Sequence, residues 1–301
     1  MYIMGIDIGG TTTKAGLIKD NIIIDRADIK TDRNDVMRGV AKVMHEVMSK
    51  GNVKPTEIKG ISLGCPGIVK NGIVLSSANL NLKNVNLYDE MSKITSLPVY
   101  VKNDGDMATL AEYRLGAGVG SNNMVMLIFG TGVGGGIITS GFLYEGQGGS
   151  AELGHIPFVY GGLECGCGNR GCMERYVSCM ALSALAKDML DTGEKGILEN
   201  KDIIPASEID RAYMLGDEVA SRIVEEYSSR LAQAFIAYCN IFRPDVIVVG
   251  GGLTHAPNII AKAIEKVEKL DYGYKGAPKV DIRVATLGGD AGILAGAVLF
   301  E

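Results

Sequence analysis

Three cysteines and one histidine near the middle of the chain have the spacing of a metal site. His155 precedes Cys165 by ten positions, Cys167 lies two residues further on, and Cys172 follows. Three thiolates and one imidazole make a complete tetrahedral set for zinc, and the glycines among them allow turns that aim sulfur at a metal. Four protein ligands leave no open position, so we predict a structural zinc rather than one that activates water. Reduced cysteines in a loop without metal are the alternative.

Two turns rich in glycine and threonine, about 120 residues apart, each follow an apolar run that is typical of a strand. Glycines let backbone N–H groups approach phosphate oxygens, a threonine hydroxyl adds a donor, and an aspartate at a strand end can hold a magnesium-bound water. Either turn alone could be a structural hairpin, but two in matching positions favour a nucleotide site. The residues that we assign to it are Asp7, Gly9, Gly10 and Thr11, then Thr131, Gly132 and Gly134, and finally Gly251 and Gly252 in a third glycine turn.

A third candidate lies where a predicted strand gives way to a helix at Asn103-Asp104. A carboxylate in this place commonly caps the helix N-terminus. It could instead act as a general base that takes a hydroxyl proton during phosphoryl transfer, with the neighbouring amide binding the same substrate. The motif alone favours the cap.

Predicted strands and helices alternate along the chain, which indicates an α/β fold with ligands beyond the carboxyl ends of the strands. The repeated strand, glycine turn and strand suggest two related lobes, with the two turns facing one site. By periodicity and composition, the predicted helices are 34–50, 217–242, 258–270 and 291–300, and the predicted strands are 3–8, 61–63, 99–101, 124–129 and 245–249.

Composition excludes several classes of protein. The chain of 301 residues is 47% hydrophobic and 22% charged, as is ordinary for a soluble globular protein, and its net charge of −5 offers no basic surface for nucleic acid or an anionic membrane. The N-terminus lacks the basic start and apolar region of a signal peptide, so we expect a cytoplasmic protein. The window from Leu115 to Tyr144 carries no formal charge, but its many glycines favour a buried strand and a turn over a membrane span.

Over essentially the whole chain, these motifs resemble the ROK family (repressors, open reading frames and kinases) of the actin, hexokinase and heat-shock ATPase superfamily. The segment from Glu152 through Glu174 is similar to the family's zinc signature almost without departure. The resemblance implies an α/β fold of two actin-like, ribonuclease H-like ATPase lobes with a cleft between them. We expect residues 1–118 to form the first lobe, with the C-terminal helix 290–301 packing back on it, and residues 119–289 to form the larger second lobe.

The resemblance also implies a function: transfer of a phosphoryl group from ATP to a hexose, with glucose as the first expectation. Asp104 would accept the proton of the sugar's primary hydroxyl. His155 would ligate zinc through one ring nitrogen and present the other toward the sugar. The implied cofactors are ATP, Mg²⁺ and structural Zn²⁺, and family members are commonly dimers or tetramers. The residues implied to bind the sugar are Gly64, Gly67, Asn79, Asn103, Asp104, Glu152, His155 and Glu174.

Two alternatives stay open at this point. Relatives often carry a tryptophan shortly after the asparagine that matches Asn79, whereas this chain has none. The sugar could therefore be N-acetylmannosamine, N-acetylglucosamine, allose or fructose. A sugar-responsive repressor is the second alternative, but such proteins carry an N-terminal helix-turn-helix domain, and here the first predicted strand begins at Tyr2.

Overall fold

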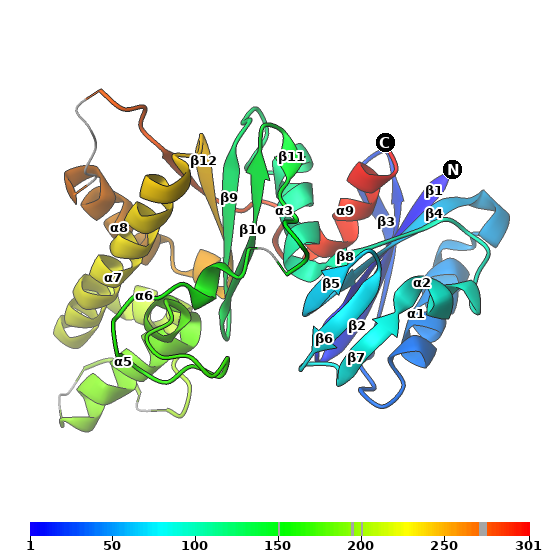
Figure 1. Ribbon diagram of the computed structural model, residues 1–301. Helices are drawn as coiled ribbons and strands as arrows, with labels where there is room; N and C mark the ends of the chain where they lie inside the picture. The colour runs from blue at the N-terminus through cyan, green and yellow to red at the C-terminus, as the bar shows by residue number, and fades with distance from the viewer. Residues whose placement is uncertain (150, 194–195, 200, 271–275) are drawn as a thin grey trace. The chain divides into compact units, whose positions relative to one another are not determined.

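The computed structural model describes residues 1–149, 151–193, 196–199, 201–270 and 276–301 (Figure 1). It contains two compact units. The first consists of Met1–Gly120, Gly136–Ala151 and Thr286–Glu301, and the second of Ser121–Gly135 and Glu152–Ala285. The lobes expected at 1–118 with 290–301, and at 119–289, stay a prediction, and contacts place residues 136–151 with the first unit.

The first unit is built on a five-stranded sheet with the strand order β3-β2-β1-β4-β8. Its three antiparallel strands are β1 (Tyr2–Ile8), β2 (Thr12–Lys19) and β3 (Ile22–Lys30), and β4 (Ile58–Cys65) and β8 (Val99–Asn103) continue the sheet in parallel. The first glycine turn joins β1 and β2 as a hairpin, as predicted, and the N–H of Gly9 donates to the carbonyl of Thr12 across it at 3.0 Å.

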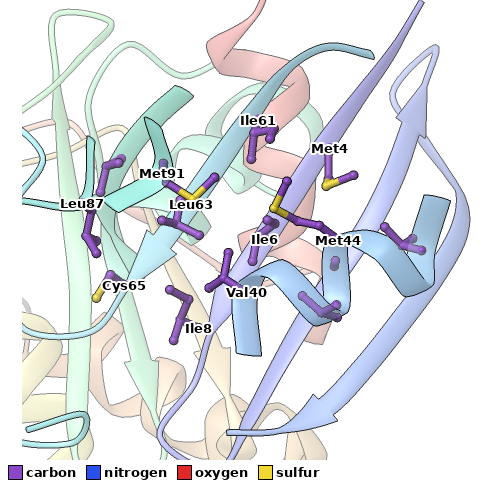
Figure 2. Close-up of a cluster of buried hydrophobic side chains, with 14 of the residues drawn as sticks. Met4, Ile6, Ile8, Val40, Met44, Ile61, Leu63, Cys65, Leu87 and Met91 are labelled. Carbon is purple, nitrogen blue, oxygen red and sulfur yellow. The ribbon is translucent and has the colours of Figure 1, made fainter. Parts of the chain in front are cut away.

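Alternate residues of β1 face different helices, because successive side chains of a strand point to opposite faces of its sheet. Figure 2 shows Met4, Ile6 and Ile8 packed with residues of α1 (Val36–Gly51) in a fully buried core. On the other face, a Cβ atom at Gly5 would lie 2.1 Å from the carbonyl oxygen of Ile293 in α9 (Ala291–Leu299). Glycine at position 5 therefore lets the C-terminal helix lie directly on the sheet.

The remaining elements of the first unit surround this sheet. α3 (Asp104–Leu115) packs against α9, and a small antiparallel sheet precedes α2. The small sheet consists of β5 (Ile68–Lys70), β6 (Ile73–Ser77) and β7 (Leu82–Asn86), and it is followed by α2 (Leu87–Ser92); a 3-10 turn at Pro55–Glu57 leads into β4.

The second five-stranded sheet has the order β11-β10-β9-β12-β13, which is the counterpart of the first. Its parallel strands are β9 (Met124–Phe129), β12 (Val246–Gly251) and β13 (Asp281–Val284), and the antiparallel pair is β10 (Val133–Thr139) with β11 (Phe142–Leu143). The helices of the second unit are α4 (Glu174–Val177), α5 (Cys179–Asp191), α6 (Ala206–Met214), α7 (Glu218–Phe242) and α8 (Pro257–Leu270). Among the described residues, no helix is both long and apolar enough to cross a membrane.

Two runs of glycine that the sequence places in turns belong partly to strands. Gly134 to Gly136 lie inside β10, and Gly250 and Gly251 end β12. The reason is close approach of neighbouring backbone: a Cβ atom at Gly135 would lie 2.0 Å from the carbonyl oxygen of Met126. The turns themselves are therefore shorter than predicted. The α/β fold is confirmed, and the predicted helix 217–242 is α7, whose N-cap Asp217 accepts a hydrogen bond from the N–H of Ala220 at 2.7 Å.

Candidate active site and metal centre

Three adjacent parallel strands of the first unit end side by side. In the register of β1 and β4, Asp7 lies opposite Gly64, and in that of β4 and β8, Cys65 lies opposite Asn103. The carboxyl ends of β1, β4 and β8 therefore carry Asp7, Gly64 and the Asn103-Asp104 pair in one row, which is where α/β sheets bind ligands. A Cβ atom at Gly64 would lie 3.8 Å from Cα of Asp104, so this glycine leaves room beside the carboxylate.

The helix cap at this junction is Asn103 and not Asp104. The side-chain oxygen of Asn103 accepts hydrogen bonds from the N–H groups of Gly105 at 2.7 Å and Asp106 at 3.1 Å. Its amide nitrogen donates to the carbonyl of Gly67 at 2.9 Å. The preference for a capping carboxylate is therefore corrected: the amide one residue earlier already satisfies the helix N-terminus, and the carboxylate of Asp104 accepts a hydrogen bond from the N–H of Gly105 at 2.9 Å.

The carboxylate of Asp7 feels the charge of Asp104. Burial and, to a smaller extent, the negative charge of Asp104 raise the pKa of Asp7 to about 6, against the opposing effect of Lys14. Burial also raises the pKa of Asp104, against the lowering effect of the hydrogen bond from Gly105. Two carboxylates with raised pKa values at one strand-end row are typical of a catalytic site, and a carboxylate with a raised pKa is a better proton acceptor.

Asn79, one of the residues implied to bind the sugar, lies against the first glycine turn within the same unit. Gly67 has a φ of +103°, which favours glycine, and a Cβ atom there would lie 2.3 Å from the carbonyl oxygen of Ser76. A Cβ atom at Gly10 would lie 3.4 Å from Cβ of Asn79. The structure therefore brings Asn79 to the turn formed by Gly9, Gly10 and Thr11, a proximity that no local motif in the sequence shows.

A loop that the sequence analysis missed braces this turn. Thr31 donates its N–H to the carbonyl of Thr11 at 2.9 Å and its hydroxyl to the carbonyl of Gly9 at 2.7 Å. Arg33 donates its Nε to the carbonyl of Gly10 at 3.1 Å. Residues 31–33 follow β3, about twenty positions after the turn in the chain, and their polar character alone marks them only as loop residues.

In the second unit, the second and third glycine turns follow β9 and β12, which are paired in parallel with Gly251 opposite Phe129. A Cβ atom at Gly251 would lie 2.3 Å from the carbonyl oxygen of Phe129, and one at Gly252 would lie 3.3 Å from Sγ of Cys179. Thr131 and Gly134 are exposed. Both turns therefore lie at the carboxyl ends of neighbouring strands, in the same relation to their sheet as the first turn has to its own.

Glu174 joins the second turn to the cysteine cluster. Its Oε2 accepts a hydrogen bond from the N–H of Val133 at 2.9 Å, and a Cβ atom at Gly132 would lie 2.0 Å from that oxygen. Its Oε1 lies 3.9 Å from Sγ of Cys165. Glycine at position 132 is therefore what allows this carboxylate to reach the turn.

The predicted metal ligands come together. The ligand atoms of His155, Cys165, Cys167 and Cys172 all lie within 4.8 Å of one another. Sγ of Cys167 and Sγ of Cys172 are 3.6 Å apart, and Nδ1 of His155 is 3.6 Å from Sγ of Cys165. Zinc with tetrahedral bonds of about 2.3 Å to sulfur and about 2.0 Å to nitrogen separates such ligand atoms by about 3.5–3.8 Å. The four side chains therefore fit zinc in their chemistry, and these two pairs also have the spacing that zinc requires.

Titration of the thiols bears on how a metal would bind. The backbone N–H of Asn169 lowers the pKa of the Cys167 thiol, which favours the thiolate that metals bind. Burial raises the pKa of the Cys172 thiol to about 12, with Cys167 the next cause. A bound cation would instead lower the pKa of the Cys172 thiol, because it stabilises the thiolate directly. Metal binding at this cluster therefore releases protons and weakens as the pH falls.

The predicted sugar ligands of the second unit surround the same cluster. Nε2 of His155 lies 4.0 Å from Oε2 of Glu152, on the ring edge opposite Nδ1. Buried Tyr238 donates its hydroxyl to the carbonyl of Leu153 at 2.6 Å and fixes the turn that carries the histidine. His155 therefore presents one ring nitrogen to the cysteines and the other to a carboxylate.

The candidate residues thus form two groups, each gathered inside its own unit. The first unit holds Asp7, Gly9, Gly10, Thr11, Gly64, Gly67, Asn79, Asn103 and Asp104, and the second holds Thr131, Gly132, Gly134, Glu152, His155, Cys165, Cys167, Cys172, Glu174, Gly251 and Gly252.

Comparisons with known proteins match the whole chain. The model of the ROK family matches residues 3–301. A glucokinase of Halalkalibacterium halodurans is 32% identical over 100% of this chain and 95% of its own, and a glucokinase of Thermotoga maritima is 33% identical over 100% and 98%. The crystal structure of a ROK family glucokinase from Streptomyces griseus, in complex with glucose and AMPPNP, matches with a TM-score of 0.84 and 29% identity, covering 99% of both chains. The predicted actin-like α/β fold is thereby confirmed.

Proposed function

Because this chain belongs to the ROK family, we propose that it is a kinase that transfers the γ-phosphoryl group of ATP to glucose and yields glucose 6-phosphate. The observation that carries the proposal is the similarity, over its full length, to glucokinases. The geometry at Asp104 supports it from within the chain, since this carboxylate stands at a strand end, is not the helix cap and has a raised pKa.

The chemistry assigned to the first unit is proton transfer and phosphate binding. Asp104 accepts the proton of the 6-hydroxyl group as that oxygen forms a bond to the γ-phosphorus, and the bond from phosphorus to the bridging oxygen breaks so that ADP leaves with the electron pair. Backbone N–H groups of Gly10 and Thr11 bind phosphate oxygens, and Gly9, whose own N–H donates to the carbonyl of Thr12, shapes the turn that presents them. Asp7 would hold the Mg²⁺ that accompanies ATP, and the ion would supply positive charge beside the phosphates.

The remaining candidates divide between sugar and nucleotide. Asn79, Asn103, Gly64 and Gly67 bind the sugar from the first unit. From the second unit, Glu152, His155 and Glu174 bind sugar hydroxyls, and Thr131, Gly132, Gly134, Gly251 and Gly252 bind the nucleotide. His155, Cys165, Cys167 and Cys172 would hold the zinc, and Nδ1 of His155 on the cysteine side would leave Nε2 for a sugar hydroxyl, which the position of Glu152 beside Nε2 supports. A cytoplasmic location and a dimeric or tetrameric state belong to the same proposal.

A coupled assay with a panel of hexoses and MgATP tests the function. The panel contains glucose, N-acetylmannosamine, N-acetylglucosamine, allose and fructose. We expect the highest kcat/KM with glucose, because sites that hydrogen-bond single hydroxyls reject epimers. A higher value with another hexose would revise the substrate and keep the enzyme class. Phosphorylation of none of them, with sugar-dependent binding of DNA at moderate salt, would replace the kinase by a regulator.

A further inference from the structure

The side chain of Arg33 lies where the first glycine turn meets the loop of Asn79. Its Nε donates to the carbonyl of Gly10 at 3.1 Å. A Cβ atom at Gly10 would lie 3.9 Å from Nη2 of Arg33 and 3.4 Å from Cβ of Asn79, so both side chains converge on one point of the turn. The guanidinium is therefore held between the residues proposed for phosphate and those proposed for sugar.

The positive charge of Arg33 is not neutralised by an ion pair within the described ranges of the chain. The acidic residues beside it in sequence serve the backbone instead. Asp32 accepts from the N–H of Asn34 at 2.9 Å, and Asp35 accepts from the N–H of Arg38 at 3.1 Å as the N-cap of α1. Arg33 is exposed, and with Nε engaged by Gly10 its Nη1 and Nη2 donors remain for an anion.

Phosphoryl transfer would bring more negative charge to a unit whose strand ends are already acidic. Asp104 raises the pKa of Asp7, so these two carboxylates repel each other. A nucleoside triphosphate adds several negative charges. Phosphoryl transfer is accelerated chiefly by cations that stabilise the charge on the transferring group, and an arginine can bind two of its oxygens at once.

We propose that Arg33 is a further catalytic residue, which binds the oxygens of the transferring phosphoryl group. This inference rests on the proposed function. As the 6-hydroxyl oxygen bonds to the γ-phosphorus, its proton passes to Asp104 and ADP leaves with the electrons of the broken bond. The Nη donors of Arg33 hold the non-bridging oxygens throughout, so that the group stays bound as it becomes the phosphate of the product.

A purely structural role would consist of bracing the carbonyl of Gly10, and substitutions separate the two roles. Arg33→Gln keeps an N–H donor for that carbonyl but removes the charge, and Arg33→Lys keeps the charge but loses the paired donors. Arg38→Gln is the matched control, because Arg38 is also an exposed arginine, five residues further on in α1.

The experiment measures kcat, the KM for MgATP, thermal unfolding, and the affinities for glucose and glucose 6-phosphate by calorimetry. For Arg33→Gln we expect kcat to fall about 10³-fold. We expect the Kd for glucose to change by less than about twofold and the Kd for glucose 6-phosphate to rise about tenfold, since only the product carries the phosphate that Arg33 holds. Arg33→Lys should recover part of the lost kcat, and Arg38→Gln should behave as the wild type.

Two results would overturn the assignment. A wild-type kcat in Arg33→Gln would show that the charge has no role in transfer. Equal losses in Arg33→Gln and Arg33→Lys, with lower melting temperatures and weaker binding of glucose and its phosphate alike, would show that the residue only supports the turn. The failure of the proposed function looks different, because there the wild-type protein itself would phosphorylate no hexose, and the role of Arg33 would be lost with it.

Discussion

At the scale of single residues, Asp104 carries the sharpest prediction. Asp104→Asn should lower kcat by about 10²–10⁴-fold, because an amide cannot accept the proton of the attacking hydroxyl. Glucose binding should remain within a few fold of wild type, since the amide keeps the shape and hydrogen-bonding capacity of the side chain. Steady-state kinetics and calorimetry measure the two quantities. Asp106→Asn, two residues further on in the same helix, is the control, and near wild-type turnover in Asp104→Asn would remove Asp104 from the mechanism.

Asp7 carries a prediction about stability. Burial is the main cause that raises its folded pKa to about 6 from the usual 3.8, so between those values the folded protein binds more protons than the unfolded chain. The carboxylate therefore costs stability that rises from little below pH 4 to its full size above pH 6, on the order of 3 kcal/mol. Asp7→Asn should raise the free energy of unfolding at pH 7 and not at pH 4.

Denaturation with urea at both pH values measures that difference for the ligand-free protein. Asp28→Asn is the matched control, because Asp28 is an exposed carboxylate on β3 of the same sheet. An equal change in stability for Asp7→Asn at both pH values would contradict the prediction.

Single residues also show which features of the site can be predicted from the sequence. The motif Asn103-Asp104 identified the right junction, but it could not say which side chain caps the helix. That choice depends on Gly67, more than thirty residues earlier, whose carbonyl holds the amide of Asn103 in the capping orientation. Arg33 was not predicted as a site residue for the same reason, since the carbonyl that it binds belongs to Gly10, in the turn between β1 and β2.

At the scale of elements, periodicity and glycine content predicted α1, α3, α7, α8, α9 and the three turns, but not α2, α4, α5 and α6, nor where the strands end. A glycine run looks the same in sequence whether it forms a turn or a strand. At Gly135 the deciding fact is the carbonyl of Met126 on the neighbouring strand, which leaves no space for a side chain. Such close approach between strands is a tertiary property, so the turn of β10 was predicted too long.

At the scale of elements, the prediction concerns the loop that contains Cys165, Cys167 and Cys172. We expect metal analysis to find about one zinc per chain, and Cys172→Ser should lose it, because three ligands bind zinc far less tightly than four. Cys179→Ser is the control, since that thiol bonds the carbonyl of Phe129 and lies outside the cluster. Zinc content that is unchanged in Cys172→Ser, or absent from freshly purified wild type, would contradict a four-ligand site.

At the scale of the whole molecule, the repeated strand-turn-strand pattern proved to be the most informative feature of the sequence. It predicted two related units, and the two five-stranded sheets have counterpart strand orders. The return of the C-terminal helix to the first unit was expected from the resemblance, but nothing in the sequence predicted that residues 136–151 also belong to that unit. The C-terminal segment is attached to the first unit by contacts such as those of buried Glu112. Its carboxylate accepts hydrogen bonds from the N–H groups of Ala117 and Leu287.

The effect of a sugar on the stability of the whole molecule tests sugar binding separately from catalysis. A ligand that binds only the folded protein stabilises it by about 2.7 kcal/mol at a concentration 100 times its Kd. For a chain of this size, that corresponds to a rise in melting temperature of about 4 °C. Glucose should therefore raise the melting temperature in a concentration-dependent way, allose should do so less, and Asp104→Asn should keep the response because it binds sugar without turning it over. A scan in which no hexose shifts the melting temperature of either protein would contradict the sugar site, whereas a shift in Asp104→Asn together with lost turnover separates binding from proton transfer.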